Sequence, residues 1–234
     1  MSGDGACHRR AVLRAAGLAV TGPLLLAGCS TDQQREPAGS GPGPPLPATE
    51  DLMREHGLLN RILVIYDEVG RRLGADQPVP AGPLHQAAQI VLRFVHEHHE
   101  HLEEQYVFAP LQGTDREITR LTEVLATQHS RGELITVSVA SRTSGALSAA
   151  DRQALAGELA AFARMYLPHE SREDTVVFPR LRDALGAAAF AALSEQFAQL
   201  EDERFGAHGF AEVVDQVADI EKTLGIADLA QFTA

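Results

Sequence analysis

Residues 92–106 read LRFVHEHHEHLEEQY, and their apolar residues recur at the spacing of an α-helix. The stripe runs through Leu92, Val95, Leu102 and Tyr106, and it includes one histidine, His99. Similar stripes recur from residue 49 onward, and none of these segments shows the alternation of apolar and polar residues that is typical of a strand. The sequence therefore predicts an all-α protein.

Four helices joined by short loops are expected, and such helices pack as an up-down-up-down four-helix bundle. The first predicted helix has Thr49 as its N-cap, and the second begins near Pro83. The third begins with a capping box of Thr114 and Glu117, and the fourth begins at Ser148 and Asp151. The bundle should cover residues 49–185. Residues 186–234 should form a C-terminal helical extension, with a break near Gly206 and Gly209 and a C-cap at Gly225.

The first 48 residues are expected to serve export and tethering. Residues 1–29 resemble a signal peptide, with the twin arginines Arg9 and Arg10 before an apolar run that is too short to span a bilayer. Leu26-Ala27-Gly28-Cys29 resembles a lipobox, in which Cys29 would be acylated; a generic secretion signal is the alternative. Residues 30–48 are rich in Pro, Gly and Ser and should form a linker. The protein is then expected to leave the cytoplasm by the twin-arginine route and to be lipid-anchored outside the cytoplasmic membrane, or periplasmic.

Composition excludes several functional classes. The 234-residue chain has 32 acidic and 20 basic residues, which gives a formal charge of −12. This charge argues against binding to nucleic acid or to an anionic membrane surface, so the lipid anchor is the one membrane contact expected. Its two cysteines exclude a disulfide scaffold and a zinc ribbon. Nothing in the sequence resembles a phosphate-binding glycine loop or a nucleophile–base pair. A protein partner is not indicated.

Each of the four expected bundle helices carries one histidine on its apolar stripe: His56, His99, His129 and His169. A single histidine on such a stripe is more often a core residue than a metal ligand. Four of them, one per helix, would point at the same interior, and each would otherwise need its own buried partner.

Two segments 70 residues apart share the pattern H-E-x-x-E-[ED]-x-x-V-F, one from His99 and the other from His169. A histidine and a glutamate four residues apart lie on one helix face, so His99 with Glu103 and His169 with Glu173 can each chelate a metal. Two such pairs and two further histidines suit a carboxylate-bridged pair of iron ions. The alternative is a pair of charged helix faces, which does not explain why the whole pattern recurs.

The dense histidine cluster offers competing ligands. His96 and Glu100 have the same spacing as His99 and Glu103, but only the latter pair aligns with the second segment. His98 and His101 have no carboxylate four residues on, so they are expected to be solvated surface residues, with a weak exposed chelating patch as the alternative.

Over about residues 50–185 the sequence resembles the hemerythrin-like, or HHE cation-binding, family. The resemblance rests on Glu55-His56-Gly57, His99 to Phe108, Gln128-His129 and His169 to Pro179, in this order. It implies a four-helix bundle around two non-haem iron ions. The residues that it implies as metal ligands are His56, His99, Glu103, His129, His169 and Glu173.

Three features depart from the family or stay open. Oxygen-carrying members have a fifth histidine four residues after the third-helix histidine, where this chain has Glu133, which is either an additional ligand or a solvent-facing residue. Pro168 precedes His169 and is expected to bend the helix, with or without functional meaning. Tyr66, Tyr106 and Tyr166 are expected as core residues or pocket residues.

The functional expectation is a di-iron protein that binds or senses O2, or a related small ligand such as peroxide or nitric oxide. The alternatives are a di-iron enzyme that disproportionates peroxide or oxidises a small substrate, and iron handling; the absent fifth histidine favours these over an oxygen carrier. A metal-free bundle used for protein contact is the third possibility.

Overall fold

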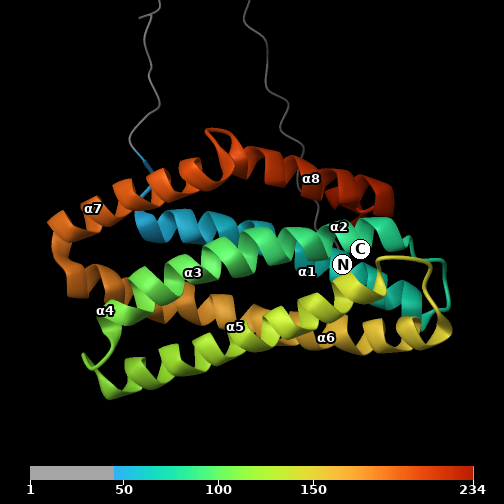
Figure 1. The fold of residues 1–234 in the computed structure, drawn as a ribbon, viewed down its shortest axis with the longest axis horizontal. Coiled ribbons are helices and arrows are strands. Elements are labelled where there is room, and N and C mark those ends of the chain that lie inside the picture. Colours follow the sequence, from blue (N-terminus) through green and yellow to red (C-terminus); the bar gives the residue numbers. More distant parts are fainter. Residues whose placement is uncertain (1–44, 234) are drawn as a thin grey trace, which may run out of the picture. The chain divides into compact units, whose positions relative to one another are not determined.

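The computed structural model describes residues 45–233, and these residues form helices and no strand, as the sequence predicts. The signal peptide, Cys29 and residues 30–44 of the expected linker lie outside the described residues. The helices follow one another as shown in Figure 1. Their bounds are α1 Ala48–Gly74, α2 Ala81–Ile90, η1 Val91–His99, α3 Glu100–Leu102, η2 Glu103–Phe108, α4 Ala109–Leu111, α5 Arg116–Arg142, α6 Ala149–Arg172, η3 Glu173–Val177, α7 Phe178–Phe205, α8 Gly209–Leu224 and η4 Leu229–Phe232.

The predicted four-helix bundle is confirmed. Its members are α1, the unbroken run from α2 to α4, α5, and the run from α6 through η3 into the start of α7. α1 packs along α6, and α5 packs against both α6 and α2. The fourth member ends at Gly186, whose φ of 70° and ψ of 168° interrupt the helix. Glycine adopts this conformation without the steric cost that a Cβ would add.

The C-terminal extension lies against the bundle. The later part of α7 contacts α1, and α8 contacts α1 and α2. The apolar face of α8 is buried in one core with α1, α2 and α6, through Val213, Val217, Ile220 and Leu224. Gly225 ends α8 in the left-handed conformation, φ 72°, as predicted for its C-cap.

Two of the predicted helix starts are wrong. α1 begins at Ala48 after Pro47, so Thr49 is not an N-cap but a buried residue of the first turn. α5 is capped by Asp115, whose carboxylate accepts the N–H groups of Glu117 and Ile118. The hydroxyl of Thr114 instead donates to the preceding turn.

The other two starts are close to their predicted positions. α2 begins at Ala81, two residues before Pro83, which therefore stands inside its first turn. At the start of α6 the predicted capping box of Ser148 and Asp151 is present. In both cases the local sequence supplies what a helix N-terminus requires, namely a tolerated proline or an acceptor for free N–H groups.

Three π-helical segments, η1, η2 and η3, interrupt the α-helices where the repeated motif lies. The apolar periodicity predicts helix there but contains no sign of the wider turns. π-helical turns occur frequently at functional sites, because the extra residue changes which side chains share a face. α6 continues through Pro168 to Arg172, and η3 begins directly after it, at Glu173.

The buried apolar residues form two clusters. One combines α1, α2, η1, α5, α6 and α8, and the other combines the start of α1 with η2, α5, η3 and α7. Between them lies a layer of buried histidines and carboxylates. None of the helices in residues 45–233 is both long enough and apolar enough to cross a membrane.

Candidate metal centre

The four stripe histidines and both motif glutamates meet in the polar layer. His56 comes from α1, His99 from η1, His129 from α5 and His169 from α6, and each is at most 4% exposed. Glu103 opens η2 and Glu173 opens η3, and both are fully buried. The structure therefore brings together all six residues that the sequence singles out.

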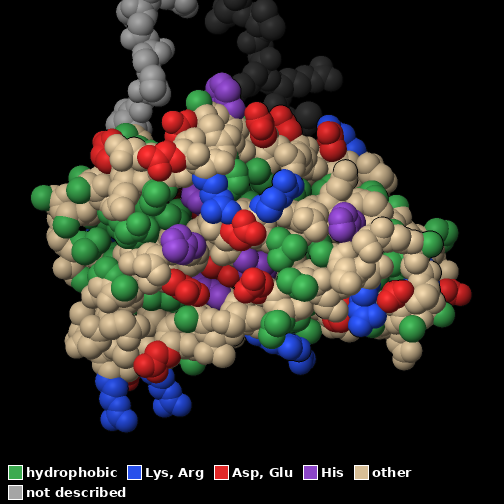
Figure 2. All heavy atoms as spheres, in the orientation of Figure 1, with side chains coloured by type: hydrophobic (Ala, Val, Ile, Leu, Met, Phe, Trp, Pro, Cys, Tyr) green, Lys and Arg blue, Asp and Glu red, His purple; other side chains and the backbone are tan. Residues whose placement is uncertain are grey.

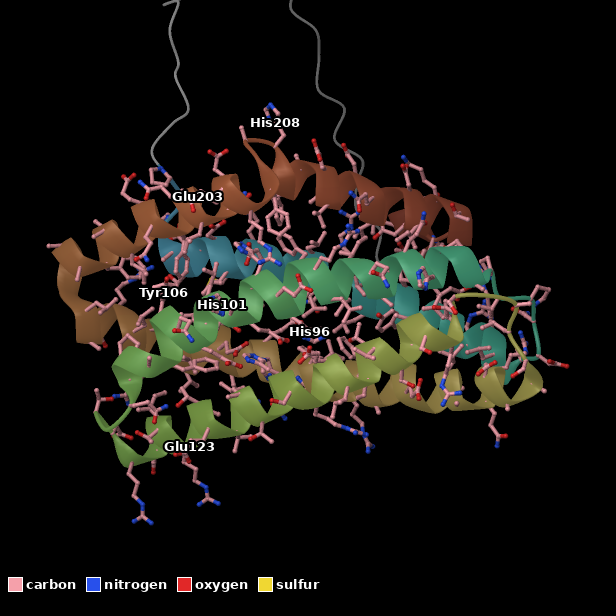
Figure 3. All side chains as sticks on the ribbon, viewed as in Figure 1. His96, His101, Tyr106, Glu123, Glu203 and His208 are labelled. Carbon is pink, nitrogen blue, oxygen red and sulfur yellow. The ribbon has the colours of Figure 1, made fainter. Side chains whose placement is uncertain are left out.

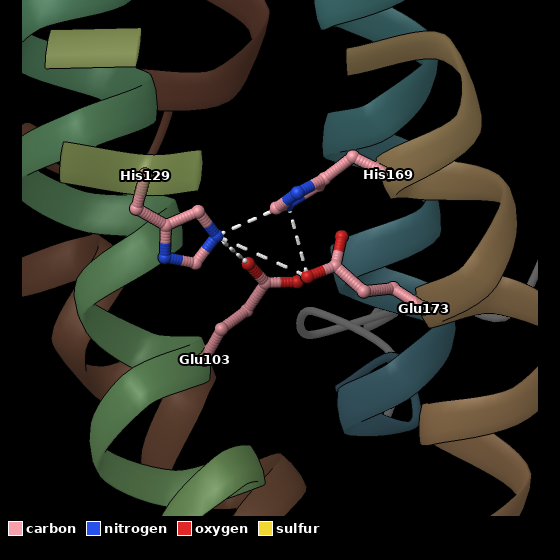
Figure 4. Close-up of side chains that lie close together, drawn as sticks. All are labelled: Glu103, His129, His169 and Glu173. Carbon is pink, nitrogen blue, oxygen red and sulfur yellow. Dashed lines mark hydrogen bonds and ion pairs between the residues drawn. The ribbon is translucent and has the colours of Figure 1, made fainter. Parts of the chain in front are cut away.

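One group of four donors lies around a common point (Figure 4). The Nε2 atoms of His129 and His169 are 3.1 Å apart, and both face the two carboxylates. His129 Nε2 lies 3.4 Å from Glu103 Oε2, and His169 Nε2 lies 3.1 Å from Glu173 Oε1. These four residues have the residue types and the proximity of a metal site.

The second group faces the same carboxylates from the other side. His56 Nε2 and His99 Nε2 lie 3.7 Å and 3.5 Å from Glu103 Oε1. His56 Nε2 also lies 3.5 Å from Glu173 Oε2. Each carboxylate thus turns one oxygen toward each histidine pair, which is the geometry of a bridge between two metal positions.

The donor atoms fit a pair of metal ions. Neither oxygen of Glu103 or Glu173 accepts a well-formed hydrogen bond from residues 45–233, and His56 Nε2 is likewise unpaired there. Buried carboxylates without partners are costly, and coordination of a metal is one of the ways in which proteins satisfy them. Metal–donor distances of about 2.1 Å place neighbouring donors about 3 Å apart, close to the spacing observed.

The opposite ring nitrogen of each histidine is held by an acceptor. The Nδ1 atoms of His56, His99, His129 and His169 donate to Asp174 (2.8 Å), Glu55 (2.7 Å), Glu104 (2.9 Å) and the amide oxygen of Gln128 (2.9 Å). A proton on Nδ1 leaves the lone pair on Nε2, toward the carboxylates. This arrangement fixes the tautomer and the ring orientation of metal-binding histidines.

The structure explains two further positions of the repeated motif. Its sixth residue, Glu104 or Asp174, accepts the Nδ1 proton of the single histidine on another helix. Its last residue, Phe108 or Phe178, stacks on that same histidine, with ring centroids 5.6 Å and 5.7 Å apart. The two halves of the bundle therefore use the motif in the same way.

Sequence reasoning missed the four acceptors, although the signal was present. The third acidic residue of each motif is Glu104 or Asp174. Glu55 and Gln128 each stand directly before a single stripe histidine, His56 or His129, and each holds the motif histidine of the neighbouring helix. These pairings are also unequal, because His99 faces a carboxylate and His169 an amide.

Replacing Glu104 with alanine should weaken metal binding about 10- to 100-fold, which is the usual effect of removing such an acceptor. His129 would lose the bond that fixes its ring, while its Nε2 stays available. The measurement is a competition titration against a chromogenic chelator. Glu104→Gln should keep most of the affinity, because an amide oxygen already accepts the Nδ1 proton of His169. The control is Glu123→Ala on the exposed face of α5, which should leave the affinity unchanged (Figure 3). An unchanged affinity in Glu104→Ala would show that this bond does not tune the site.

The charges of the site compensate one another. Burial lowers the pKa of His56 and His129, but the surrounding carboxylates outweigh burial and raise both pKa values well above the usual range. Burial raises the pKa of Glu103, but His99, His129 and His56 outweigh it and hold that pKa well below the usual range. Without a cation, charged His56 and His129 therefore act as partners of Glu103. A bound cation would take over the protons' role, so binding releases protons.

A buried network adjoins this site. Tyr166 donates to Glu100 Oε1 at 2.6 Å, and His96 Nδ1 donates to Glu100 Oε2 at 2.7 Å. Tyr166 also lies against His169 and against Gly132. His96 and Glu100 thus belong to the supporting network rather than to the group of six. Tyr66 and Tyr166 are buried core residues, and Tyr106 is partly buried against Phe197.

The prediction that His98 is a surface residue is wrong. Its exposure is 4%, because the C-terminal extension covers this face of η1 and places Phe205 against the His98 ring, 5.0 Å between centroids. Burial lowers the pKa of His98 to about 3, so the ring is neutral at physiological pH. His101 is exposed, as predicted. On the face of the molecule that is turned to the viewer, Figure 2 shows histidine and acidic side chains close together, and Figure 3 labels His96 and His101.

Glu133 is exposed and lies outside the group of six donors. The neighbouring Gly132 turns toward the interior instead, where the Tyr166 ring fills the space beside it. The position four residues after His129 therefore adds no fifth nitrogen donor and no further carboxylate in this structure.

A surface groove of about 480 Å³ reaches the outer side of the site between α5 and α6. Leu121, Val124, Leu125 and Pro168 contribute apolar lining, and Gln128 and His169 are also among its walls. A small molecule can therefore approach His169 past apolar side chains, and Glu117, Arg120 and Arg172 add charged groups to the same walls.

The comparisons with known proteins agree with this geometry. The hemerythrin HHE cation binding domain matches residues 48–181. An uncharacterised protein of Mycobacterium tuberculosis strain H37Rv is 52% identical over 191 residues, which cover 81% of this chain and 74% of the relative. An uncharacterised protein of Mycobacterium bovis strain AF2122/97 matches with the same identity and coverage. No solved structure matches the chain.

Proposed function

Because the chain belongs to the hemerythrin HHE cation-binding domain family, we propose that it holds two iron ions and binds O2 or a related small ligand at them. One observation carries the proposal. Two histidine pairs face two shared carboxylates that are buried and otherwise unpaired within residues 45–233.

The donor set supports iron. The six side chains offer imidazole nitrogens and carboxylate oxygens and no thiolate, and the thiolates that favour copper(I) or iron–sulfur clusters are absent from this group. Paired carboxylates and histidines inside a helical bundle are the usual setting of two-iron centres. Manganese would be the next candidate by the same chemistry.

The iron pair would supply open coordination positions and electrons for O2, peroxide or nitric oxide. The chain would do the rest. His56 and His99 would hold one position, His129 and His169 the other, and Glu103 and Glu173 would join them. This gives at most four protein donors at each position, so a six-coordinate ion keeps room for a ligand. The stacked rings of Phe108 and Phe178 shield two of the histidines and favour a dry pocket.

A second candidate is the disproportionation of hydrogen peroxide to water and O2. The observation that favours it is that the two proposed metal positions have equal sets of donors. Each position has two imidazoles, and both share the same two carboxylates. Glu133 faces solvent, so nothing from that position makes the two sides different. A balanced pair with room on both sides suits a ligand that contacts both ions.

The test begins with iron. The untagged protein is loaded with ferrous iron in the absence of O2, desalted and analysed for metal, and two ions per chain are expected. Less than about half an equivalent would defeat the proposal. The loaded protein is then cycled between O2 and argon. A reversible change in the visible spectrum without turnover supports ligand binding, whereas rapid release of O2 from peroxide, lost in His99→Ala, supports the enzyme and contradicts a simple binding protein.

A further inference from the structure

We propose that Asp51, Glu55, Glu201 and His98 form a third cation site, separate from the proposed iron pair, which binds one divalent ion such as Fe²⁺ or Mn²⁺. The site lies on the far side of the Glu55–His99 hydrogen bond. It joins α1 and η1 to the C-terminal extension.

The three carboxylates lie within reach of a single ion. Asp51 and Glu55 are one turn apart on α1, and Glu201 reaches them from α7. One oxygen of each lies within 4.8 Å of one oxygen of each of the others. Asp51 and Glu55 are 8% and 3% exposed, and Glu201 is partly buried, so the site opens toward α7.

Two buried polar atoms that face the cluster have no partner. Glu55 Oε2 accepts from His99, but Glu55 Oε1 has no hydrogen-bond partner within residues 45–233. The same holds for His98 Nε2, which lies 3.7 Å from Glu55 Oε1. His98 is 4% exposed, so its Nε2 lies in the interior beside that carboxylate oxygen. The imidazole nitrogen and the carboxylate oxygen are therefore two buried donor atoms that a cation could use.

The cluster is short of positive charge. Besides the histidines that contact Glu55, Arg54 is the one basic side chain in contact with the cluster within residues 45–233, at 2.5 Å from Asp51 and 2.7 Å from Glu201. Three carboxylates and one guanidinium leave two negative charges when all are ionised. Burial and Glu55 together raise the pKa of Asp51 to about 6, although Arg54 opposes them. One divalent ion would balance the cluster.

The chemistry of the donors selects the ion. Carboxylate oxygens with one imidazole suit Mn²⁺ and Fe²⁺, whereas a site without thiolate gives no preference for soft metals. Glu55 would contact this ion with one oxygen and hold the His99 ring with the other. An ion that enters from the α7 side would therefore be connected to the His56–His99 position through the Glu55 carboxylate and the His99 ring.

The site also gives the extension a function. Glu201 lies beyond residues 48–181, the part that the family domain matches. The extension buries His98 and supplies Glu201 to the same cluster, so the site requires both parts of the chain.

The test counts Mn²⁺ ions on the full chain, purified without a histidine tag and freed of metal. Equilibrium dialysis against Mn²⁺ without O2, followed by elemental analysis, should give three ions per chain for the unaltered protein. Glu201→Gln should lose one ion and keep two. Glu203→Gln is the matched control, because Glu203 is exposed on the same helix and should leave three ions bound (Figure 3).

Electron paramagnetic resonance gives a second readout. An isolated Mn²⁺ produces a six-line spectrum, which two ions coupled through shared carboxylates do not. This signal should be present in the unaltered protein, persist in Glu103→Gln and disappear in Glu201→Gln. A stoichiometry and spectrum that Glu201→Gln leaves unchanged would overturn the third site, even with two ions bound at the pair. Loss of the pair with retention of the Glu201-dependent ion would instead defeat the proposed function alone.

Discussion

Replacing Glu103 with glutamine should leave the protein with less than one ion at the paired site, where the unaltered chain is expected to hold two. Glu103 belongs to both donor groups, and its two oxygens face the two histidine pairs separately. An amide has one oxygen to offer and no negative charge, so both positions lose a ligand at once. We expect affinity at the pair to fall more than 100-fold, because acceptors outside the coordination sphere already account for 10- to 100-fold. Elemental analysis after anaerobic loading with iron measures it.

The matched control is Glu133→Gln, an equal chemical change at an exposed position of α5. It should keep both ions and the spectrum of the unaltered protein. Circular dichroism separates loss of metal from loss of fold, since Glu103→Gln preserves the size of the buried side chain. A folded Glu103→Gln protein that still binds two ions at the paired site would contradict the bridging role of this residue.

Replacing Gly132 with alanine should destabilise the protein by about 1–3 kcal/mol, the usual cost of overfilling a packed interior. A Cβ at this position would lie 2.0 Å from the hydroxyl oxygen of Tyr166. Tyr166 is 1% exposed and its hydroxyl is bonded to Glu100, so the ring has little freedom to move. Urea denaturation of the metal-free protein measures the change, and the Tyr166–Glu100 hydrogen bond should be lost or lengthened.

Gly157→Ala is the control for the intrinsic effect of the substitution. Gly157 is an exposed residue inside α6, and a Cβ there meets no atom within 4 Å. Alanine favours the helix over glycine by about 0.5–1 kcal/mol, so this variant should be more stable than the unaltered protein. Equal stability of the two variants would show that the contact between Gly132 and Tyr166 does not limit the packing.

The histidine and glutamate pattern allowed the candidate site to be predicted without a structure. A ligand pair four residues apart is a local property of a helix, and its repetition 70 residues later indicates a second helix with the same role. The acceptors Glu104 and Asp174 are part of the same repeated pattern. Their function, which is to accept the Nδ1 proton of a histidine, depends on which helix lies opposite. Local spacing does not contain that information.

The errors about the residues around the site concern contacts between separate helices. His98 was expected at the surface, because η1 alone offers no reason to bury it, whereas α7 brings Phe205 over it. The sequence leaves Glu133 open as a ligand or a solvent-facing residue. The structure places it outside, because Gly132 faces the interior from α5 and Tyr166 of α6 fills the space beside it. The π-helical segments were not foreseen, since apolar periodicity does not distinguish a wider turn from an ordinary one.

The sequence alone determined that the chain is helical, that four helices carry one interior histidine each, and that two of them add a carboxylate one turn later. These are properties of short segments, which periodicity and residue type record directly. The tertiary structure decided which oxygen faces which histidine, which acceptor holds each ring, and that the C-terminal extension closes a polar cluster against α1. Such features depend on the packing of residues between 25 and 147 positions apart, and burial and charge act there through contacts between helices rather than along them.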